Sequence, residues 1–402
     1  MPKQKVAIIG GGAAGIMCAC HLDTSVYDVH LYEKTSRLGR KLLVAGEGGF
    51  NLTYHEVPEV MAERYSDPEF VLPFLTAFSS KDLRKWLSQL GVETFVGTSG
   101  KVFPVKGIKP YMVVNKLQET LDSSGVVVHT IHQWLGWENG SLLFDNDGEK
   151  REIKADVVIL ALGGGSWVKT GSDGQWMRLL QDKGITCSEL EASNCRWIVR
   201  WHPEIVRLCS GRPLKNIVVT VNGISHRGEA MISADGLEGG VIYAHAANIR
   251  NAISKQGKAS IQIDLKPDLQ QSVIAQRLAK RKKSIKHCLV NELRLSIEAF
   301  RILRYSVGKD VYNDPYQLAA HVKCCEVITQ NHAGIDSAIS SAGGLKLTEI
   351  DANLQVKKLP NHYAIGEMLD WDTRTGGYLL QLCFSTAVAV AKRLNVRSLS
   401  AD

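Results

Sequence analysis

The chain has 402 residues, of which 45% are apolar, 22% charged and 7% aromatic. These values are ordinary for globular proteins and exclude the disordered and fibrous classes. Apolar runs such as Val157–Leu162 are far shorter than the roughly 20 residues of a membrane helix, and the mean hydropathy is -0.07, so we expect no membrane protein. The formal net charge of +7 suits anionic ligands such as phosphates but does not by itself indicate nucleic acid.

The nine cysteines are scattered, odd in number and without any C-x-x-C pair. A disulfide framework is not expected in a chain that is long enough to bury a large core. No Cys/His spacing indicates a zinc site or another metal site. The chain begins MPKQKVAIIGGG, with no apolar leader before the first strand signal. We therefore expect a cytoplasmic protein without a bound metal.

A βαβ unit is predicted at the start of the chain. Lys5–Ile9 (KVAII) is a short apolar run that is typical of a buried strand. Ala13–Leu22 has a helical composition, and Val26–Tyr32 alternates like a second strand. Such a unit opens many nucleotide-binding folds.

Between the first strand and the helix lies Gly10-x-Gly12-x-x-Gly15. Gly10 permits the tight turn, Gly12 leaves room for a pyrophosphate, and Gly15 lets helix and strand pack closely. Free N–H groups at the Ala13-Ala14 start of the helix would face the phosphates. Glu33, at the end of the second strand, is placed to hold ribose hydroxyls. The pattern predicts a dinucleotide site, because a merely structural glycine turn would not account for Glu33.

The middle of the chain is predicted to be mixed. Residues 55–125 have a largely helical composition, interrupted by prolines, and short strands over 126–131, 141–144 and 150–153 suggest a small meander. Ala155–Leu162 follows, an apolar run typical of a central parallel strand, and it ends at Gly163, the first of three glycines.

Composition changes after about residue 192. A basic run, Arg277–His287, fits a solvated helix face, with a polyanion contact as the alternative. A helix is also expected over Tyr316–Ile328, with Cys324 and Cys325 on two of its faces. The other expected elements are strands over 196–199, 217–221, 239–243, 260–265 and 361–365, one or two helices over 269–305, and a last helix over 378–394.

Four segments together resemble a known family. They are the first glycine motif continued through EKTSRLGRKLLVAGEGGFNLTY (33–54), ALGGGSWVKTGSDG (161–174), GRPLKNIVV (211–219) and GEMLDWDTRTGGYLLQ (366–381). They resemble the extended FAD fingerprint of two-dinucleotide-domain flavoproteins. More narrowly, the chain is similar to the bacterial HI0933-like family (BaiN-like or YhiN-like) of NAD(P)/FAD-dependent flavoprotein oxidoreductases.

Two segments depart from the family pattern. The usual S-G-G-G-R-C-N-x-T-N is AGEGGFNLTY here, with Gly49 and Phe50 in place of arginine and cysteine. The usual T-H-x-G-x-S-G-P is SADGLEGG at 233–240, without the histidine. These departures predict a substrate pocket of a different kind, so no substrate is carried over.

The resemblance implies an α/β fold with a Rossmann-like FAD-binding domain, interrupted by an inserted β-rich domain and a small helical domain. We expect residues 1–192 and 335–402 to form the discontinuous FAD-binding domain. Residues 193–265 and 323–334 would form the β-rich substrate or cover domain, and residues 266–322 a helical subdomain.

The resemblance also implies roles for individual residues. Glu367 is expected to bind the ribityl hydroxyls, and the helix that begins after Gly376-Gly377 to face flavin N1 and C2=O, where its positive end stabilises the reduced ring. Trp371 and Tyr378 would stack on the ring or the substrate, or pack in the core. Four further residues are expected near the pyrophosphate or the isoalloxazine, with a solvated surface role as the alternative: Arg40, Lys41, Glu47 and Asn51. The expected cofactor-binding residues are Gly10, Gly12, Ala13, Ala14, Gly15, Glu33, Lys34, Arg40, Lys41, Asn51, Gly163, Gly366, Glu367, Gly376, Gly377 and Tyr378.

The sequence thus predicts an FAD-dependent oxidoreductase that transfers a hydride through flavin N5 to or from a small-molecule substrate. FAD is expected to be non-covalent, because no histidine or cysteine lies in a flavin-attachment context. Without a second G-x-G-x-x-G motif, NAD(P)H would be a transient donor. An RNA-modifying flavoenzyme and a non-catalytic FAD-binding protein are the alternatives. No catalytic residue is assigned, nucleic-acid and membrane partners are not expected, and the oligomeric state stays open.

Overall fold

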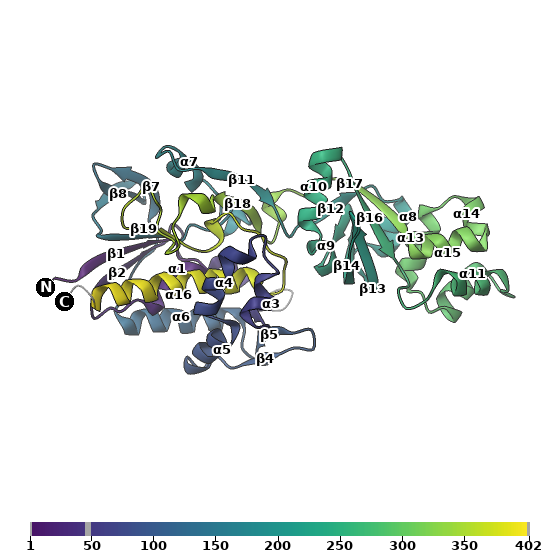
Figure 1. Cartoon of the computed structure of the whole chain (residues 1–402), viewed down its shortest axis with the longest axis horizontal. Helices are drawn as coiled ribbons and strands as arrows, with labels where there is room; N and C mark the ends of the chain where they lie inside the picture. Colours follow the sequence, from purple (N-terminus) through teal and green to yellow (C-terminus); the bar gives the residue numbers. More distant parts are fainter. Residues whose placement is uncertain (1, 45–49, 400–402) are drawn as a thin grey trace. The chain divides into compact units, whose positions relative to one another are not determined.

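The computed structural model describes residues 2–44 and 50–399, and the chain divides into two compact units (Figure 1). The first unit combines Met1–Ala192 with Ile339–Asp402, and the second is Ser193–Ala338. Both ends of the chain therefore belong to one unit, and the second unit is a single insertion. A separate helical subdomain within this insertion stays a prediction.

A five-stranded parallel sheet forms the centre of the first unit, in the order β19-β10-β1-β2-β6. The central strand β1 (Gln4–Ile9) lies between β10 (Val157–Leu160) and β2 (Tyr27–Tyr32), with β6 (Val127–His129) and β19 (His362–Ala364) at the edges. The strands β1 and β10 are buried on both faces, as expected for apolar runs in a parallel sheet. Because β19 comes from the C-terminal segment, the two ends of the chain complete one sheet.

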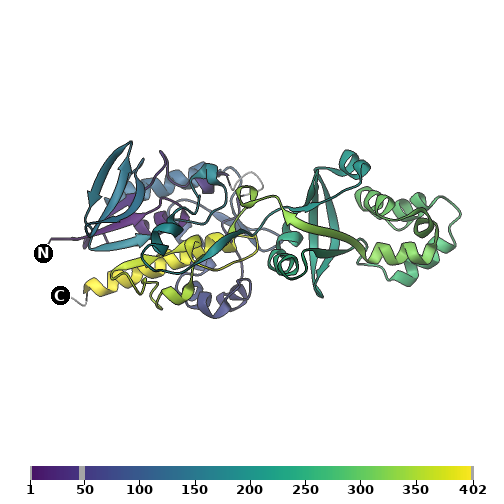
Figure 2. The same ribbon diagram turned by 90° about the horizontal axis from the view of Figure 1, so that it is seen from above.

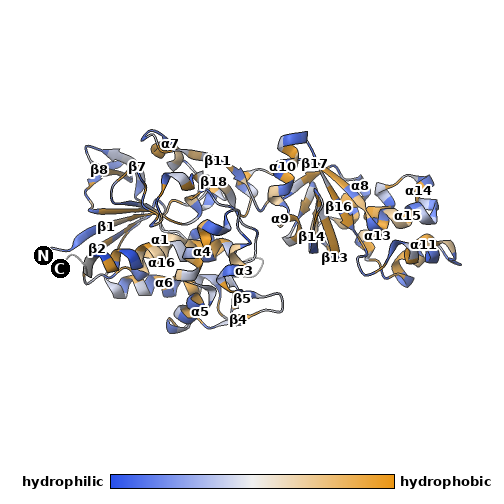
Figure 3. Cartoon of the chain, viewed as in Figure 1, coloured by the Kyte–Doolittle hydropathy of each residue, from blue (hydrophilic) through white to orange (hydrophobic). Residues whose placement is uncertain are grey.

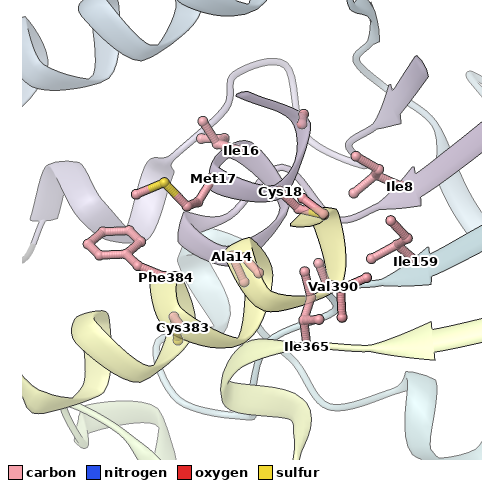
Figure 4. Close-up of a cluster of buried hydrophobic side chains, with 14 of the residues drawn as sticks. Ile8, Ala14, Ile16, Met17, Cys18, Ile159, Ile365, Cys383, Phe384 and Val390 are labelled. Atoms are coloured by element: carbon pink, nitrogen blue, oxygen red, sulfur yellow. The ribbon is translucent and has the colours of Figure 1, made fainter. Parts of the chain in front are cut away.

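Helices cover one face of this sheet and an antiparallel meander lies on the other side (Figure 1). The helices are α1 (Ala13–His21), α6 (Pro110–Ser124) and α16 (Tyr378–Leu399), and α1 packs against both of the others. Figure 4 shows the core between α1, α16 and the strands, where Met17, Phe384 and Ile159 are buried. The meander consists of β7 (Gln133–Glu138), β8 (Ser141–Asn146) and β9 (Glu149–Ile153).

Helix α16 is, among the described residues, the one helix that is long and apolar enough to span a membrane by length and composition. It is packed against α1 and α4, and Leu382, Ala387 and Ala391 on it are fully buried. Its apolar composition is therefore that of a core helix. The remaining elements of this unit are α2 (Arg40–Val44), β3 (Thr53–Tyr54), α3 (Pro58–Ala62), α4 (Pro68–Ala77), α5 (Ser80–Gln89), β4 (Thr94–Val96), β5 (Lys101–Pro104), α7 (Trp176–Gln181), β11 (Cys187–Ala192) and β18 (Ser341–Leu345).

The second unit contains a closed barrel of six strands in the order β12-β15-β14-β13-β16-β17. Side chains alternate between inward and outward along β13, where Ile217, Val219 and Val221 are buried while the residues between them are more exposed. Apolar residues dominate the barrel strands in Figure 3. The strands are β12 (Trp197–Val199), β13 (Arg212–Val221), β14 (Ile224–Ser233), β15 (Gly236–Glu238), β16 (Ala259–Asp264) and β17 (Cys325–His332).

Helices of this unit gather at one end of the barrel (Figures 1 and 2). Among them are α11 (Gln271–Ala279), α13 (Ile297–Ser306), α14 (Lys309–Asn313) and α15 (Pro315–Lys323). The others are α8 (Pro203–Cys209), α9 (Gly240–Tyr243), α10 (Ala246–Gln256) and α12 (Ile285–His287).

Two expected elements have the wrong type. The strand expected over 239–243 is the helical turn α9, which packs on β14 and buries both Val241 and Ile242. A strand would have placed these two neighbours on opposite faces. The helix expected over 316–328 ends at Lys323, and Cys325 begins β17, so Cys324 and Cys325 do not share a helix. Pairing of Cys325 with Ile263 of β16 overrides the local helical pattern.

Two further expectations need correction in detail. The stretch 269–305 is broken more often than expected, because Ser284 and Ser296 cap new helices by accepting from the backbone N–H groups of His287 and Ala299. The strand expected over 126–131 does not belong to the meander. It is β6, and it pairs in parallel with β2.

Candidate functional site

Three glycines shape the turn between β1 and α1, each for a different reason. Gly10 has a φ of +111°, and a Cβ there would lie 2.3 Å from the carbonyl oxygen of Ala161. A Cβ at Gly15 would lie 1.9 Å from the carbonyl oxygen of Gly10, so α1 can approach this turn only without a side chain. A Cβ at Gly12 would meet nothing within 4 Å. Open space therefore lies beside the N-terminus of α1, which starts at Ala13-Ala14 without a side-chain cap.

The carboxylate of Glu33 is fixed beside this turn. Its Oε2 accepts a hydrogen bond from the backbone N–H of Gly11 at 2.8 Å, and its Oε1 accepts from that of Thr35 at 2.7 Å. Gly11 itself has no room for a side chain, because a Cβ would lie 2.3 Å from Leu38. Each carboxylate oxygen has more than one lone pair, so Glu33 keeps acceptor capacity for the hydroxyls of a ligand.

Glu367 and Lys41 form an ion pair beside the ends of β10 and β19. The Nζ of Lys41 lies 2.9 Å from Oε2 of Glu367 and donates to the Ser166 hydroxyl at 2.7 Å. The Glu367 side chain is 8% exposed and that of Lys41 27%. Oε1 of Glu367 also accepts from the backbone N–H of Ser341. Glu367, which was expected to bind the ribityl hydroxyls, thus also pairs with a cation and accepts a hydrogen bond from a backbone N–H group.

Glycines bring the ends of the strands close to these groups. A Cβ at Gly164 would lie 2.0 Å from the Ser341 hydroxyl and 3.1 Å from Oε1 of Glu367. Gly163 has a φ of +71°, and its carbonyl oxygen accepts from the Trp176 indole. Gly366 has a φ of +79°, and a Cβ there would lie 2.7 Å from the Cβ of Ala14. The strand β19 can therefore end directly against α1.

The start of α16 is equally close-packed. Gly377 has a φ of +91°, and a Cβ there would lie 2.6–2.7 Å from three backbone atoms of Thr53. Gly376, with a φ of +134°, faces the ring of Tyr378. Tyr378 is 1% exposed, stacks on Tyr54 with ring centroids 5.1 Å apart, and burial raises its pKa to about 12.

Other expected site residues are placed differently. Lys34 pairs with Asp173 at 2.7 Å, which ties the end of β2 to the segment 161–174. Arg40 is exposed and makes no hydrogen bond or ion pair with any described residue. Asn51 has a buried Oδ1 without a hydrogen-bond partner in the described structure. Trp371 is buried, and its indole donates to the carbonyl oxygen of Gly366, so of its two expected roles it has core packing. Glu47 lies outside the described residues.

The sequence analysis did not identify several residues that form hydrogen bonds or ion pairs in this region. They are Gly11, Ser166, Asp173 and Ser341, together with Glu56, Arg64 and Arg374 near Tyr378. Asp173 and Ser166 lie inside the segment 161–174, so that segment was the available signal. Glu56, Arg64 and Ser341 carry no motif, and Glu56 and Ser341 are far in sequence from Tyr378 and Gly165, with which they form hydrogen bonds.

No described group of three or more His, Cys, Asp or Glu side chains is arranged to hold a metal ion. All nine cysteines are free thiols. Burial raises the pKa of Cys383, which lies next to Gly366, and that of Cys18 well above the usual range, so both are neutral thiols.

The polar groups and the space described above fit the parts of an FAD molecule. The space beside Gly12 and the uncapped start of α1 suit a pyrophosphate. Glu33 and Glu367 offer carboxylate oxygens near two different strand ends. The orphaned Oδ1 of Asn51 is a buried acceptor without a donor, which a ligand N–H or O–H would satisfy.

Comparison with known proteins agrees with this geometry. The family model of the HI0933-like protein Rossmann domain matches residues 4–393. A 3-dehydro-bile acid delta(4,6)-reductase of Clostridium scindens is 24% identical over 400 residues, which are 95% of this chain and 97% of the relative. A ribosomal RNA dihydrouridine synthase of Escherichia coli is 23% identical over 404 residues, which are 98% of each chain.

Solved structures share the fold at low sequence identity. A 3-ketosteroid delta1-dehydrogenase of Sterolibacterium denitrificans, solved with 1,4-androstadiene-3,17-dione, has a TM-score of 0.55 at 11% identity, and the match covers 99% of this chain and 100% of that one. A flavocytochrome c3 fumarate reductase has a TM-score of 0.50 at 13% identity, with 99% and 79% of the two chains covered. By its family match over residues 4–393, this chain belongs to the HI0933-like family of Rossmann-domain proteins.

Proposed function

We propose that this protein is an FAD-dependent reductase of carbon–carbon double bonds conjugated to a carbonyl group, with NAD(P)H as a transient electron donor. One observation carries the proposal: the Gly12 space, Glu33 and the Lys41–Glu367 pair gather at the carboxyl ends of the parallel strands. Ligands of open α/β sheets bind at this edge. The proposed reaction is supported by the names of two relatives, a bile acid delta(4,6)-reductase and a dihydrouridine synthase, which both describe reduction of a ring double bond.

Each group has a role in holding the cofactor. Backbone N–H groups of Ala13 and Ala14 bind the pyrophosphate at the positive end of α1. Glu33 accepts from the ribose hydroxyls and Glu367 from the ribityl hydroxyls, and Lys41 orients the Glu367 carboxylate through their ion pair. When bound, FAD supplies hydride acceptance and donation at its N5 atom.

The glycines at the start of α16 place a helix terminus near the redox ring. Because Gly376 and Gly377 carry no side chains, the start of α16 packs directly against the backbone of Thr53 and the ring of Tyr378. The positive end of a 22-residue helix favours negative charge, which the reduced flavin carries. The protein thereby supports reduction of the ring without a dedicated side chain.

A second candidate substrate is a uracil base in RNA. Relatives from Escherichia coli and Haemophilus influenzae, each 23% identical to this chain, are named ribosomal RNA dihydrouridine synthases. The exposed basic residues Lys282, Lys283 and Lys286 of the second unit suit a polyanion. A free enone and a uracil ring share the same chemistry, since in each the reduced double bond is conjugated with a carbonyl.

The experiment begins with the purified protein, which we expect to be yellow and to release FAD on acid precipitation. Anaerobic stopped-flow mixing with NADH and NADPH then shows which donor bleaches the flavin. The reduced protein is next mixed with a 3-oxo-4-ene steroid or with unmodified ribosomal RNA, and flavin reoxidation is followed. A protein that stays colourless with added FAD would falsify the proposal. Reoxidation by the RNA alone would assign the second candidate.

The cytoplasm is the proposed location. Nine free thiols, four of them in the first unit and five in the second, suit a reducing compartment.

A further inference from the structure

Three charged side chains near the start of α16 have no role in the cofactor assignment above, and they are linked through Tyr378, which was expected to contact the cofactor. Glu56, Arg64, Arg374 and Tyr378, here called the Arg374 cluster, form a chain of contacts. Arg64 donates to both carboxylate oxygens of Glu56, at 3.1 and 3.4 Å. The Tyr378 hydroxyl donates to Oε2 of Glu56 at 3.3 Å and accepts from Nη2 of Arg374 at 3.4 Å.

The charges of this cluster do not cancel. Glu56 is paired with Arg64, and its side chain is only 14% exposed. Arg374 lies over the ring of Tyr378 at 5.3 Å and has no carboxylate within ion-pair distance among the described residues. Two guanidinium groups and one carboxylate leave one net positive charge, which belongs to Arg374. This side chain is only partly exposed, so its charge is incompletely solvated.

The cluster adjoins the proposed flavin position. Arg374 precedes Gly376 by two residues, and Tyr378 is the first residue of α16. The Tyr378 ring stacks on Tyr54, the neighbour of Thr53, against which Gly377 packs. A substrate that reaches the redox ring from this side would meet Arg374.

We propose that Arg374 is the substrate-binding residue that holds the carbonyl oxygen of the double-bond substrate, and that Tyr378 and Glu56 position it. This inference rests on the proposed function and names the residue that its substrate would contact. The ligand class is a carbonyl compound that becomes an enolate, or a stable anion that resembles one.

The chemistry requires a cation at this oxygen. In the proposed reduction, a hydride from the reduced flavin forms a C–H bond at the β-carbon, and FAD is regenerated. The electrons of the double bond move toward the carbonyl, whose oxygen gains negative charge as an enolate. A proton from solvent then forms the second C–H bond at the α-carbon and the carbonyl returns. A guanidinium that is already in place stabilises the charge that develops on the oxygen.

The positioning role of Tyr378 follows from its two contacts. Its hydrogen is directed to the Glu56 carboxylate, which leaves the oxygen lone pairs for Arg374. The ring supplies a face for the guanidinium as well. Arg374 thus has an orientation in which its remaining N–H donors are available to a ligand.

The test uses pentafluorophenolate, an enolate mimic, with the FAD-loaded full-length protein. Phenolates that stack on oxidised flavin produce a long-wavelength charge-transfer band, so the titration reports binding at the ring without turnover. The variants are Arg374→Met and Arg374→Lys, with Arg151→Met as the control. Arg151 is an exposed residue of β9 that pairs with Glu149, away from the cluster. The FAD dissociation constant and the flavin potential are measured for each variant.

We expect Arg374→Met to weaken phenolate binding about tenfold to a hundredfold, the usual effect of one lost hydrogen bond to a charged group. Arg374→Lys should recover part of this loss, because it keeps the charge but not the planar fork. Tyr378→Phe should weaken phenolate binding about twofold to tenfold, with an unchanged thermal midpoint. Arg151→Met should bind phenolate like the wild type, and FAD affinity should be unchanged in Arg374→Met, Arg374→Lys and Arg151→Met.

Three results would overturn the proposal. One is phenolate affinity in Arg374→Met equal to that of the wild type. Another is a wild type that binds FAD but produces no charge-transfer band. The third is a lowered flavin potential or FAD affinity in Arg374→Met with unchanged phenolate binding, which would assign Arg374 to the cofactor. Failure of the proposed function is separate, because it appears as a wild type that does not bind FAD or whose flavin no donor reduces.

Discussion

The first unit gathers polar groups where its parallel strands end, whereas the second unit closes its strands around an apolar interior. Glu33 and Glu367 follow the ends of strands β2 and β19, and Lys41 of α2 donates to Glu367. In the barrel, Trp197 and His245 are fully buried, and the indole N–H of Trp197 and Nδ1 of His245 have no partner among the described residues. The open edge of a parallel sheet leaves polar groups available to a ligand, whereas a closed barrel pairs the edges of its strands with one another.

This difference predicts two kinds of mutational effect. Substitutions at the strand ends of the first unit should change ligand affinity, with or without a change in stability. Equivalent substitutions in the second unit should change stability alone. The following predictions test this division, beginning with the largest expected effect.

Gly377→Val should abolish FAD binding and destabilise the first unit by about 4 kcal/mol, the sum of overpacking and backbone strain. The valine side chain would overlap with backbone atoms of Thr53, and the φ of Gly377 is +91°. Gly257 at the end of α10 is the matched control, with a φ of +72° and nothing within 4 Å of a Cβ. Gly257→Val in the second unit should cost only the strain, about 1–2 kcal/mol, and leave FAD affinity intact. Urea unfolding and FAD fluorescence titration measure both. Normal FAD binding by Gly377→Val would contradict the placement of this turn at the cofactor.

Lys41→Met should destabilise the protein by about 3 kcal/mol, because it leaves the Glu367 carboxylate buried without its cation. Adding Glu367→Gln should recover part of this loss, which a double-mutant cycle measures. The barrel offers a comparison in Lys323, which lies 2.6 Å from Asp264 with both side chains about one-fifth exposed. Lys323→Met should change stability without changing FAD affinity. If Lys41→Met binds FAD like the wild type, the ion pair does not orient a cofactor ligand.

Gly12→Ala should weaken FAD binding about tenfold to a hundredfold without lowering the thermal midpoint. A methyl group at this position meets no protein atom, but it occupies the space proposed for the pyrophosphate. Gly15→Ala is the contrasting variant, since its Cβ would lie 1.9 Å from the carbonyl oxygen of Gly10 and should lower the midpoint. Thermal unfolding without FAD and titration with FAD separate the two effects. Equal FAD affinity in Gly12→Ala and wild type would place the pyrophosphate elsewhere.

Acid should lower the stability of both units, because each contains a buried histidine that stays neutral in the folded state. Burial lowers the pKa of His245 to about 4, and burial, with His30 and His132, lowers that of His129 to about 4. An unfolded chain, with a histidine pKa of about 6.5, binds more protons between pH 6.5 and 4, so stability falls as pH decreases through this window. His245→Gln should reduce the loss between pH 6 and 5 by about 1 kcal/mol, measured by urea unfolding. An unchanged pH dependence would mean that His245 is not titrated on unfolding.

Local motifs were the predictable part of the first unit. The turn from Gly10 to Gly15 and Glu33 lie within one stretch of 24 residues. Their spacing is recognisable because close packing at the glycines and the hydrogen bond of Glu33 to Gly11 require it. The parallel strands were recognisable for a related reason, because burial on both faces requires uninterrupted apolar runs. The part that these residues play in binding FAD stays a prediction.

Sequence alone determined the nucleotide-type turn, the parallel strands and the family, because each depends on residues close together in the chain or on a spacing that sterics enforce. Tertiary structure decided the Lys41–Glu367 pair, whose members are 326 residues apart, and the Arg374 cluster, in which Glu56 and Tyr378 are 322 residues apart. It also converted the expected helix at Cys325 into a barrel strand. Such side chains come into contact only after distant strands have paired. The residues next to them in the sequence therefore do not indicate which charged group will lie opposite.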